Sequence, residues 1–238
     1  MDIQITFGGI ILMPTVVASL LVVSFLIIFF IMAGITIKRA DPTKSTRGFM
    51  FILEVIYNAL EKFIGDSVGD KANKFIPFIT AVAFYLGIAN LLGLIGLTPP
   101  ATDINITVAL TVVTLTYIMF VGIFSKGFGR YLKETYLGDV PKPMLILFIP
   151  INIVGELSKI ISLSFRLFGN IVSGTLLLGL FLQVVDWLFS LLPLIAWVPV
   201  LLLPFLNAFF DIFAGLMQTF IFCTLVMMWI KTASERAT

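Results

Sequence analysis

Residues 3–37 read IQITFGGIILMPTVVASLLVVSFLIIFFIMAGITI, an apolar run with no charged residue between Asp2 and Lys38. A transmembrane helix needs only about 20 such residues, so this run is long enough to cross a bilayer. The rest of the chain is similar, since 60% of its 238 residues are hydrophobic and 12% are charged. A soluble domain carries about 25% charged residues. We therefore expect a membrane protein.

Further apolar stretches follow along the chain. Residues 75–102 and 104–125 carry no charge, and each exceeds the minimum for a membrane span. In lipid, backbone polar groups must be hydrogen-bonded within the protein, which leaves helices and closed barrels as the possible structures. A barrel would show alternating segments of roughly ten residues. These longer runs therefore predict helices.

The second half contains two longer stretches, Met144–Trp187 and Leu188–Ile230, which charged residues interrupt only rarely. Each would form about 65 Å of helix, roughly twice the hydrocarbon thickness of a bilayer. Each is therefore either a bent, tilted helix or a pair of shorter helices. Prolines offer places to bend or break the chain, at Pro150, Pro193, Pro199 and Pro204. We predict an all-α polytopic membrane protein with about five crossings, of which the last two are long tilted helices that form a hairpin.

Basic residues predict a direction for these crossings, because loops rich in lysine and arginine stay in the cytoplasm. Of the 15 lysines and arginines, seven lie between the first and second spans, four follow the third span and two lie at the C-terminus. The segments 1–15, 98–106 and 183–193 carry none. We expect the N-terminus outside and the C-terminus in the cytoplasm. The first apolar run has an acidic residue before it and basic residues after it, which argues against a signal peptide.

Apolar residues between Gly48 and Gly65 follow helical spacing. This pattern predicts an amphipathic helix that lies along the cytoplasmic interface, where we expect it to dock a stalk subunit. No internal repeat or linker divides the chain. We therefore expect residues 1–238 to form a single membrane-embedded domain.

The composition argues against several kinds of chemistry. The chain has no histidine, which is the commonest general base and metal ligand, and we expect neither a metal nor a cofactor. Its one cysteine, Cys223, lies in an apolar run and is interpreted as a small buried hydrophobe. Without a phosphate-binding Gly-x-x-x-x-Gly-Lys-Ser/Thr loop, the chain alone is not expected to hydrolyse ATP. The net charge of +2 gives no reason to expect a nucleic-acid partner.

Arg166 is the most unusual residue, because it lies within the apolar sequence ISLSFRLFG. Charged residues inside membrane spans are costly and usually functional, and arginine does not deprotonate in proteins. The alternative interpretation is a structural ion pair within the bundle. Residues three or four positions apart share one helix face, and a polar stripe is predicted at Glu156, Lys159, Leu163, Arg166, Asn170 and Ser173.

Polar residues also mark the last long stretch and the start of the third span. Asn207, Asp211 and Gln218 are separated by four and seven residues and so share a helix face. For Asn207 and Gln218, ordinary interhelical hydrogen bonds are an alternative role. Asp103 and Asn105 lie at the outer end of the third span. Asp103 either stands at a membrane entrance or caps the helix that follows.

The segment SLSFRLFGN at 162–170 resembles the signature helix of subunit a of F-type ATP synthases, the ATPase protein 6 family. The run QTFIF at 218–222 resembles the second motif of that family. Further similarities are ANLLGL at 89–94 and TDIN at 102–105, in the same order along the chain. These segments together extend over most of the sequence.

The resemblance implies a mechanism and a set of partners. In this family subunit a lies beside a rotating ring of c subunits, each with a carboxyl group at mid-membrane, and two offset half-channels reach that interface from opposite sides. Arg166 is then the essential arginine facing the c-ring, and its charge favours the deprotonated carboxylate as it passes. The other implied partners are the subunit b peripheral stalk, the rest of the F-type ATP synthase and the lipid bilayer. We expect this bilayer to be a bacterial plasma membrane, with an organellar membrane as the alternative. We predict protons as the coupling ion.

The resemblance is incomplete in the outside half-channel. The family commonly carries a glutamate and a histidine on the two facing long helices, where this chain has Thr175 and Asp211. Because Thr175 cannot ionise, we predict that Asp211 alone replaces the titratable pair. It would line the outside half-channel with Gln218, Asn170 and Asp103.

Glu156 and Lys159 lie about two to three helical turns from Arg166 on its cytoplasmic side. They are either groups of the exit half-channel or a salt-bridged pair, and the sequence favours neither. A secondary transporter would show two similar halves with paired broken helices, and no such symmetry is visible. A purely structural anchor would not explain Arg166. We therefore expect an ion-translocating subunit rather than an enzyme.

Overall fold

Five apolar helical stretches long enough to cross a membrane run through the part of the chain that the structure describes. This structure is a computed structural model that describes residues 5–7, 10–39, 48–68, 74–137, 141–191, 204–206 and 208–235. The long helices are α1 (Pro14–Arg39), α3 (Ile76–Leu91), α4 (Ile104–Lys126), α6 (Leu145–Leu191) and α8 (Gly215–Ser234). A π-helical turn, η7 (Phe210–Ala214), leads directly into α8. The predicted polytopic helical fold with five crossings is confirmed.

Shorter elements connect these helices. They are the helix α2 (Phe49–Val68), the turns η2 (Leu92–Ile95) and η3 (Pro100–Thr102), and the segment α5 (Phe128–Leu132), η4 (Lys133–Leu137) and η5 (Lys142–Met144). An antiparallel hairpin of β1 (Ile5–Phe7) and β2 (Ile10–Leu12) precedes α1. The sequence did not predict this hairpin, because its residues are as apolar as the span that follows. The helix starts at Pro14, whose fixed φ suits a first helical position.

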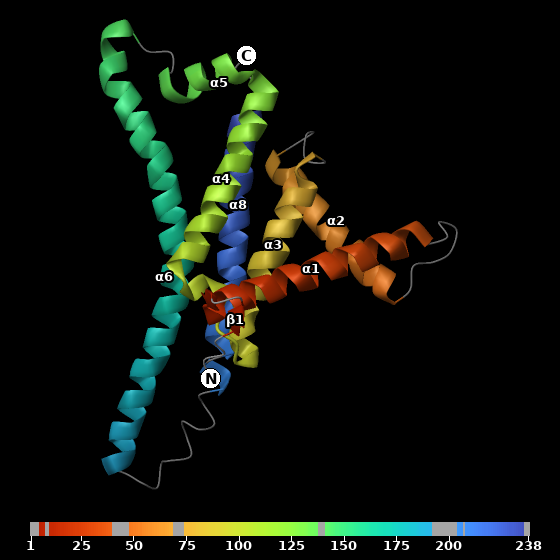
Figure 1. The fold of residues 1–238 in the computed structure, drawn as a ribbon, viewed down its shortest axis with the longest axis vertical. Coiled ribbons are helices and arrows are strands. Elements are labelled where there is room, and N and C mark those ends of the chain that lie inside the picture. Colours follow the sequence, from red (N-terminus) through yellow and green to blue (C-terminus); the bar gives the residue numbers. More distant parts are fainter. Residues whose placement is uncertain are drawn as a thin grey trace.

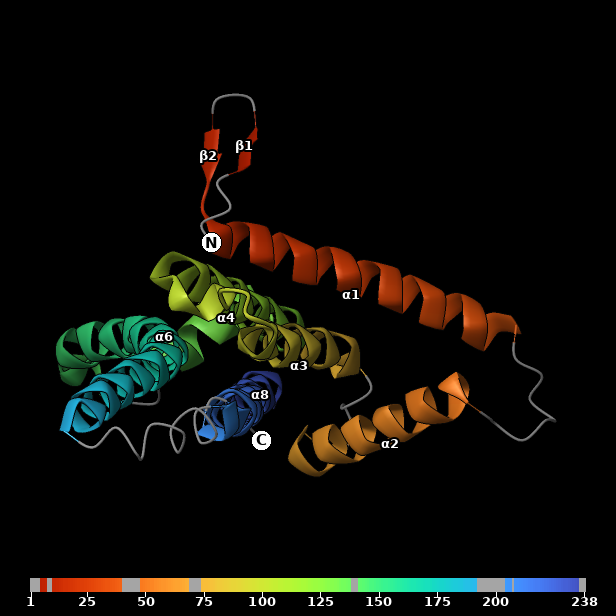
Figure 2. The same cartoon turned by 90° about the horizontal axis from the view of Figure 1, so that it is seen from below.

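The long helices form a bundle with α8 in its middle. Figure 1 shows α8 running beside α4, with α3 close by and α6 along the outer side of α4. The helix α1 crosses the bundle obliquely, and the view from below places α2 beyond α3, on the side away from α6 (Figure 2). The chain descends along α6 and returns along α8, as expected for the predicted hairpin (Figure 1). The tilt of these helices against a membrane stays a prediction.

The helix α6 is one continuous element over Leu145–Leu191. Figure 1 shows it bowed along its length rather than divided. Pro150 lies in its second turn, where the missing N–H removes a single hydrogen bond near the helix start. Of the two alternatives left open by the sequence, the single bent helix is therefore correct for this stretch. Pro193 and Pro199 lie outside the described residues.

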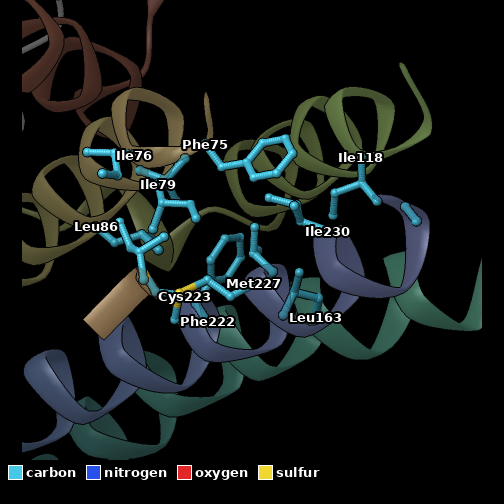
Figure 3. Packing of buried hydrophobic residues seen from close by; sticks show 14 of the residues in the cluster. Phe75, Ile76, Ile79, Leu86, Ile118, Leu163, Phe222, Cys223, Met227 and Ile230 are labelled. Carbon is cyan, nitrogen blue, oxygen red and sulfur yellow. The ribbon is translucent and has the colours of Figure 1, made fainter. Parts of the chain in front are cut away.

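Buried side chains of α8 form the centre of the hydrophobic core. Phe222, Met227 and Ile230 are fully buried, and they pack with apolar residues of α3, α4 and α6 (Figure 3). Cys223 belongs to the same cluster, as predicted for a small buried hydrophobe. Fully burying each such side chain stabilises the fold by about 1.5–3 kcal/mol. The core therefore fixes the positions of α3, α6 and α8, which carry the polar residues discussed below.

The helix α2 packs only partly on this core. Ile64 near its C-terminal end is fully buried in the core cluster. Its N-terminal half exposes Phe51, Ile52, Val55 and Tyr57. An apolar face exposed in this way suits contact with lipid or with another membrane protein. The place of α2 along the cytoplasmic interface stays a prediction.

Candidate ion-translocation site

Arg166 points away from the bundle. Its neighbours Leu163 and Leu167 are each 1% exposed and face the core, whereas Arg166 is exposed. The structure gives Arg166 no hydrogen bond and no ion pair among the described residues. The alternative of a structural ion pair within the bundle is therefore not observed in the described part of the chain.

The predicted polar stripe of α6 does not lie on one face throughout. Leu163 is buried, Arg166 is exposed, and Asn170 is half-buried against η7. The reason is geometric, because steps of three and four residues at about 100° per residue spread the six positions over roughly 100° of the helix. The stripe therefore crosses the boundary between the buried face, at Leu163, and the exposed face, at Arg166 and Ser173.

The first cavity lies between α6, η2 and η7, and we call it the Asp211 cavity. It has a volume of about 150 Å³. Its lining brings together three predicted site residues, Asn170, Thr175 and Asp211, with Gly93, Pro99, Ile171, Gly174, Leu178 and Ala214. Of the four residues predicted to line the outside half-channel, Asp211 and Asn170 lie here, whereas Gln218 and Asp103 do not.

Asp211 is the only residue with an ionisable side chain among the described residues that line the Asp211 cavity. Its carboxylate is half-buried and has neither a hydrogen bond nor an ion pair within the described part of the chain. It lies directly against Gly93, where a Cβ atom in place of the glycine hydrogen would stand 2.7 Å from Oδ2 of Asp211. Thr175 donates its hydroxyl to the carbonyl oxygen of Val172 in its own helix, 2.9 Å away.

Two asparagines hold the π turn that carries Asp211. Asn170 of α6 donates its side-chain amide to the carbonyl oxygen of Ala214 at 3.2 Å, and Asn90 of α3 donates to that of Gly215, also at 3.2 Å. A π turn displaces the backbone from the regular helical ladder, and these amides bond to successive carbonyls where the π turn meets α8. Asn90, which is 1% exposed, was not predicted as a site residue. Asn90 belongs to the ANLLGL segment that resembles the family, and this resemblance could have identified it.

Gln218 lies near the site but does not line the Asp211 cavity. It is 4% exposed, and its Nε2 has no hydrogen-bond partner among the described residues. The interhelical hydrogen bond proposed as its alternative role is therefore not observed for this nitrogen. Asn207 lies outside the described residues.

Asp103 caps α4. Its Oδ1 accepts a hydrogen bond from the backbone N–H of Asn105 at 2.9 Å, which is the N-cap interaction that the sequence offered as one alternative. Its Oδ2 accepts the hydroxyl of Thr15 at 3.2 Å, which joins α4 to α1. Asp103 lines a different cavity of about 470 Å³, together with Thr98, Thr102 and Phe168. It does not line the Asp211 cavity.

The second cavity relevant to α6 lies nearer its N-terminal end, and we call it the Glu156 cavity. It has a volume of about 410 Å³. Glu156 and Lys159 line it and form an ion pair of 2.6 Å, with Lys159 Nζ 5.7 Å from the ring centre of Trp229. Both sequence alternatives are therefore compatible with the structure, since the pair is salt-bridged and also faces a cavity.

The segment α5–η4 forms one wall of the Glu156 cavity. Lys126 binds Glu134 at 2.9 Å and donates to the carbonyl oxygen of Thr232 in α8 at 3.2 Å. The ring of Tyr131 packs so closely on Gly122 of α4 that a side chain at position 122 would overlap it. Hydrogen bonds from Lys126 and then Arg130 hold the pKa of Glu134 below its ordinary value. This wall is thus fixed to α4 and α8.

Arg166 lies between the two cavities along α6. Ile160 is the residue of the Glu156 cavity nearest to it in sequence, and Asn170 is the nearest of the Asp211 cavity. At 1.5 Å per residue, these positions are about 9 Å and about 6 Å from Arg166 along the helix axis. One permanent, exposed positive charge therefore separates two polar cavities.

Residues 16–231 match the family described as ATP synthase A chain. The chain belongs to this family. The relatives include "ATP synthase subunit a" of Citrifermentans bemidjiense, which is 32% identical over 214 residues, or 87% of this chain and 85% of the relative. The protein of the same name in Aliarcobacter butzleri is 34% identical over 195 residues, 78% of each chain. That of Mycoplasma pneumoniae is 29% identical over 236 residues, 94% of this chain and 80% of the relative.

Family membership confirms the resemblance that the motifs around Arg166 indicated. A member of the ATP synthase A chain family is an ion-translocating stator subunit of the F-type ATP synthase, and it is a membrane component without a catalytic role of its own. The chain is therefore a membrane protein and part of the ATP synthase complex. The positions of its site residues can now be interpreted within that role.

Proposed function

We propose that this subunit carries protons between the two sides of a bacterial plasma membrane, past a ring of c subunits that turns against Arg166. The observation that carries this proposal is the position of Arg166, which is exposed, unpaired among the described residues and located between the Asp211 and Glu156 cavities. A charge left unpaired inside a membrane protein needs a partner. A carboxylate on a neighbouring ring subunit supplies one.

The Asp211 cavity is the inlet in this proposal. Proton transfer needs a titratable group, and Asp211 is the one such group on the described lining of this cavity. Asn170 and Thr175 contribute a polar wall, and the Asn170 bond to Ala214 holds the two helices together. Asp103 is assigned to capping rather than to the relay, because both of its carboxylate oxygens accept hydrogen bonds.

The Glu156 cavity is the outlet. Glu156, Lys159 and Glu134 place ionisable groups on its lining, which can hold water and pass protons at the far side of Arg166. In the part of the chain that the structure describes, the two cavities do not share a lining residue. A proton can then move from one to the other only by travelling on the ring.

Arg166 acts through its fixed charge. A positive charge close to a passing ring carboxyl favours its deprotonated form, so the proton is released to the outlet before the carboxylate reaches the inlet. The same charge repels a proton that would pass directly between the cavities. A membrane potential supplies about 2.3 kcal/mol per charge per 100 mV to drive this cycle.

The proposed orientation follows the distribution of basic residues, with the N-terminus outside and the C-terminus in the cytoplasm. This orientation is supported by Lys126, Arg130 and Lys133, which surround the wall of the Glu156 cavity at one end of the bundle. The peripheral-stalk subunit b is proposed to dock on the exposed apolar face of α2. The bacterial origin of the relatives supports a bacterial plasma membrane.

Cross-linking tests the proposed contact between α6 and the ring. Ser162 is exposed one turn before Arg166, whereas the adjacent Leu163 is 1% exposed. A thiol-reactive photocross-linker on Ser162→Cys should capture the ring subunit in the assembled complex, and the same reagent on Leu163→Cys should not. The native Cys223 gives little background because it is 3% exposed. A complex that assembles without any Ser162→Cys cross-link to the ring would contradict the proposal.

A further inference from the structure

Gly93 lies so close to the Asp211 carboxylate that no side chain would fit at position 93. A Cβ atom built on Gly93 would lie 2.7 Å from Oδ2, 3.0 Å from Cγ and 3.2 Å from Oδ1 of Asp211. These three atoms are the nearest neighbours of that position, and all belong to the one carboxylate. The carboxylate therefore occupies the space into which a side chain at position 93 would project.

A hydrogen bond from the side chain of Asn90 ties the segments that carry these two positions to each other. Asn90 stands one turn before Gly93 and donates to the carbonyl oxygen of Gly215, one turn after Asp211. A Cβ on Gly215 would approach the Cβ of Asn90 to 3.0 Å, so α3 and α8 are in close contact here. The end of α3 is therefore packed against the junction between the π turn and α8.

Nothing in the local backbone requires glycine at position 93. Its φ is not positive, unlike those of Gly48, Gly96 and Gly127, and η2 is a helical turn that accepts ordinary residues. The requirement for glycine is steric and comes from Asp211. Shortening Asp211 to alanine would remove it.

A carboxylate attached at position 93 could reach the same place. The built Cβ lies 3.0 Å from Cγ of Asp211, whereas two carbon–carbon bonds of about 1.5 Å that meet at about 111° span about 2.5 Å and a single bond spans about 1.5 Å. A glutamate carries its carboxyl carbon two bonds beyond Cβ, and an aspartate one bond beyond. Glutamate at position 93 therefore matches the position of the Asp211 carboxylate best.

We infer that positions 93 and 211 are interchangeable attachment points for one inlet carboxylate, and that Gly93 is a positioning residue which leaves this place free for Asp211. The inference rests on the proposed inlet role of Asp211. What the Asp211 cavity requires is then a carboxylate at one point in space, whichever of the two facing segments supplies it.

Transfer of the carboxylate tests this inference in the intact ATP synthase. Three variants are compared in inverted membrane vesicles, with ATP-driven proton uptake and ATP hydrolysis measured together: Asp211→Ala, Gly93→Glu/Asp211→Ala and Gly93→Gln/Asp211→Ala. The first should lower proton uptake about 100-fold, because a positioned acid–base group contributes on this scale. The glutamate variant should recover roughly tenfold or more of that loss. The glutamine variant has the same shape without a titratable group and should recover none.

The outcomes separate this inference from the proposed function. Loss of uptake in Asp211→Ala without recovery in an assembled glutamate variant would overturn the exchange alone. Gly93→Asp/Asp211→Ala is the second acid-bearing variant, and failure of both to assemble would also overturn it, because the site would then not accept a carboxylate from η2. Normal uptake in Asp211→Ala would instead contradict the inlet role of Asp211 on which the inference rests. Recovery by glutamine would show that packing rather than charge had been restored, which also overturns the inference.

Discussion

The side-chain amide of Asn170 donates to the carbonyl oxygen of Ala214 across 3.2 Å and so ties α6 to the π turn that carries Asp211. This bond lies one helical turn beyond Arg166, where the two long helices of the site meet. It places Asp211, the one titratable group among the described residues that line the Asp211 cavity, next to the helix that carries Arg166.

Replacement of Asn170 by leucine should therefore lower proton pumping as well as stability. Loss of the amide leaves the Ala214 carbonyl without its partner, at a cost of about 1–3 kcal/mol, and releases the turn that orients Asp211. Thermal unfolding of the complex and proton uptake by vesicles measure the two effects. Ser19→Ala is the control, because it removes a 2.8 Å hydrogen bond between Ser19 and Tyr85 that joins α1 to α3, and neither residue lines the Asp211 or the Glu156 cavity. It should lose similar stability yet keep its pumping per assembled complex, and equal pumping losses in both variants would refute this role of Asn170.

Asp103 should tolerate loss of its charge. Asparagine caps helices about as well as aspartate, so Asp103→Asn should keep both the cap of α4 and near-normal pumping. Asp103→Ala should cost about 1 kcal/mol of stability through the lost cap. Thermal unfolding and pumping of the two variants can be compared directly. Strong inhibition by Asp103→Asn in a stable complex would instead assign Asp103 to the inlet path.

Glu156 and Lys159 should differ in their effects on pumping, although they form one ion pair. The pair is half-exposed, with 35% of each side chain accessible, so the bond itself stabilises the fold by at most about 1 kcal/mol. Glu156→Gln should reduce proton uptake severalfold, because it removes an outlet carboxylate. Lys159→Gln breaks the same pair and should reduce uptake less. Equal reductions would indicate that the pair acts only as a structural contact.

The contact between Glu134 and Lys126 should respond to pH in a defined direction. The folded pKa of Glu134 is lowered, first by the hydrogen bond from Lys126 and then by that from Arg130. Its stabilising contribution is therefore complete above the unfolded glutamate pKa of about 4.3 and is lost as the pH falls through the lower folded pKa. The difference in melting temperature between the wild-type complex and Glu134→Gln should be constant from about pH 7 to about pH 5 and should shrink at lower pH. A difference that grows on acidification would have the wrong sign for this account.

The membrane fold was predictable because a helix that crosses lipid needs about 20 consecutive apolar residues, and such runs are visible in the sequence. Charge-free runs such as residues 75–102 and 104–125 mark spans directly, and α3 and α4 coincide with them. The choice between one helix and two at residues 144–187 was left open, because the sequence does not show where the helix begins. Pro150 would break a helix at its middle but is tolerated near its start, and α6 begins only five residues earlier. The β1–β2 hairpin was missed, because alternating and helical apolar runs cannot be distinguished over three residues.

The residues of the candidate site could be named from the sequence, whereas their packing could not. The unusual charge of Arg166 and the spacing of Asp211 and Gln218 were visible in the sequence. The π turn was not, since it depends on hydrogen bonds from Asn90 and Asn170 on two other helices. Gly93 carries no side chain to attract attention, and its role is apparent only from what stands against it.

Proton uptake by inverted vesicles that contain the intact complex with Arg166→Gln tests the central claim most directly. Lys38→Gln is the control, because Lys38 is also an exposed cation but lies at the end of α1 and lines neither the Asp211 nor the Glu156 cavity. The account predicts that Arg166→Gln continues to hydrolyse ATP without acidifying the vesicles, while Lys38→Gln does both. Normal acidification by Arg166→Gln would contradict it, since no fixed charge at this position would then be needed to move protons between the two cavities.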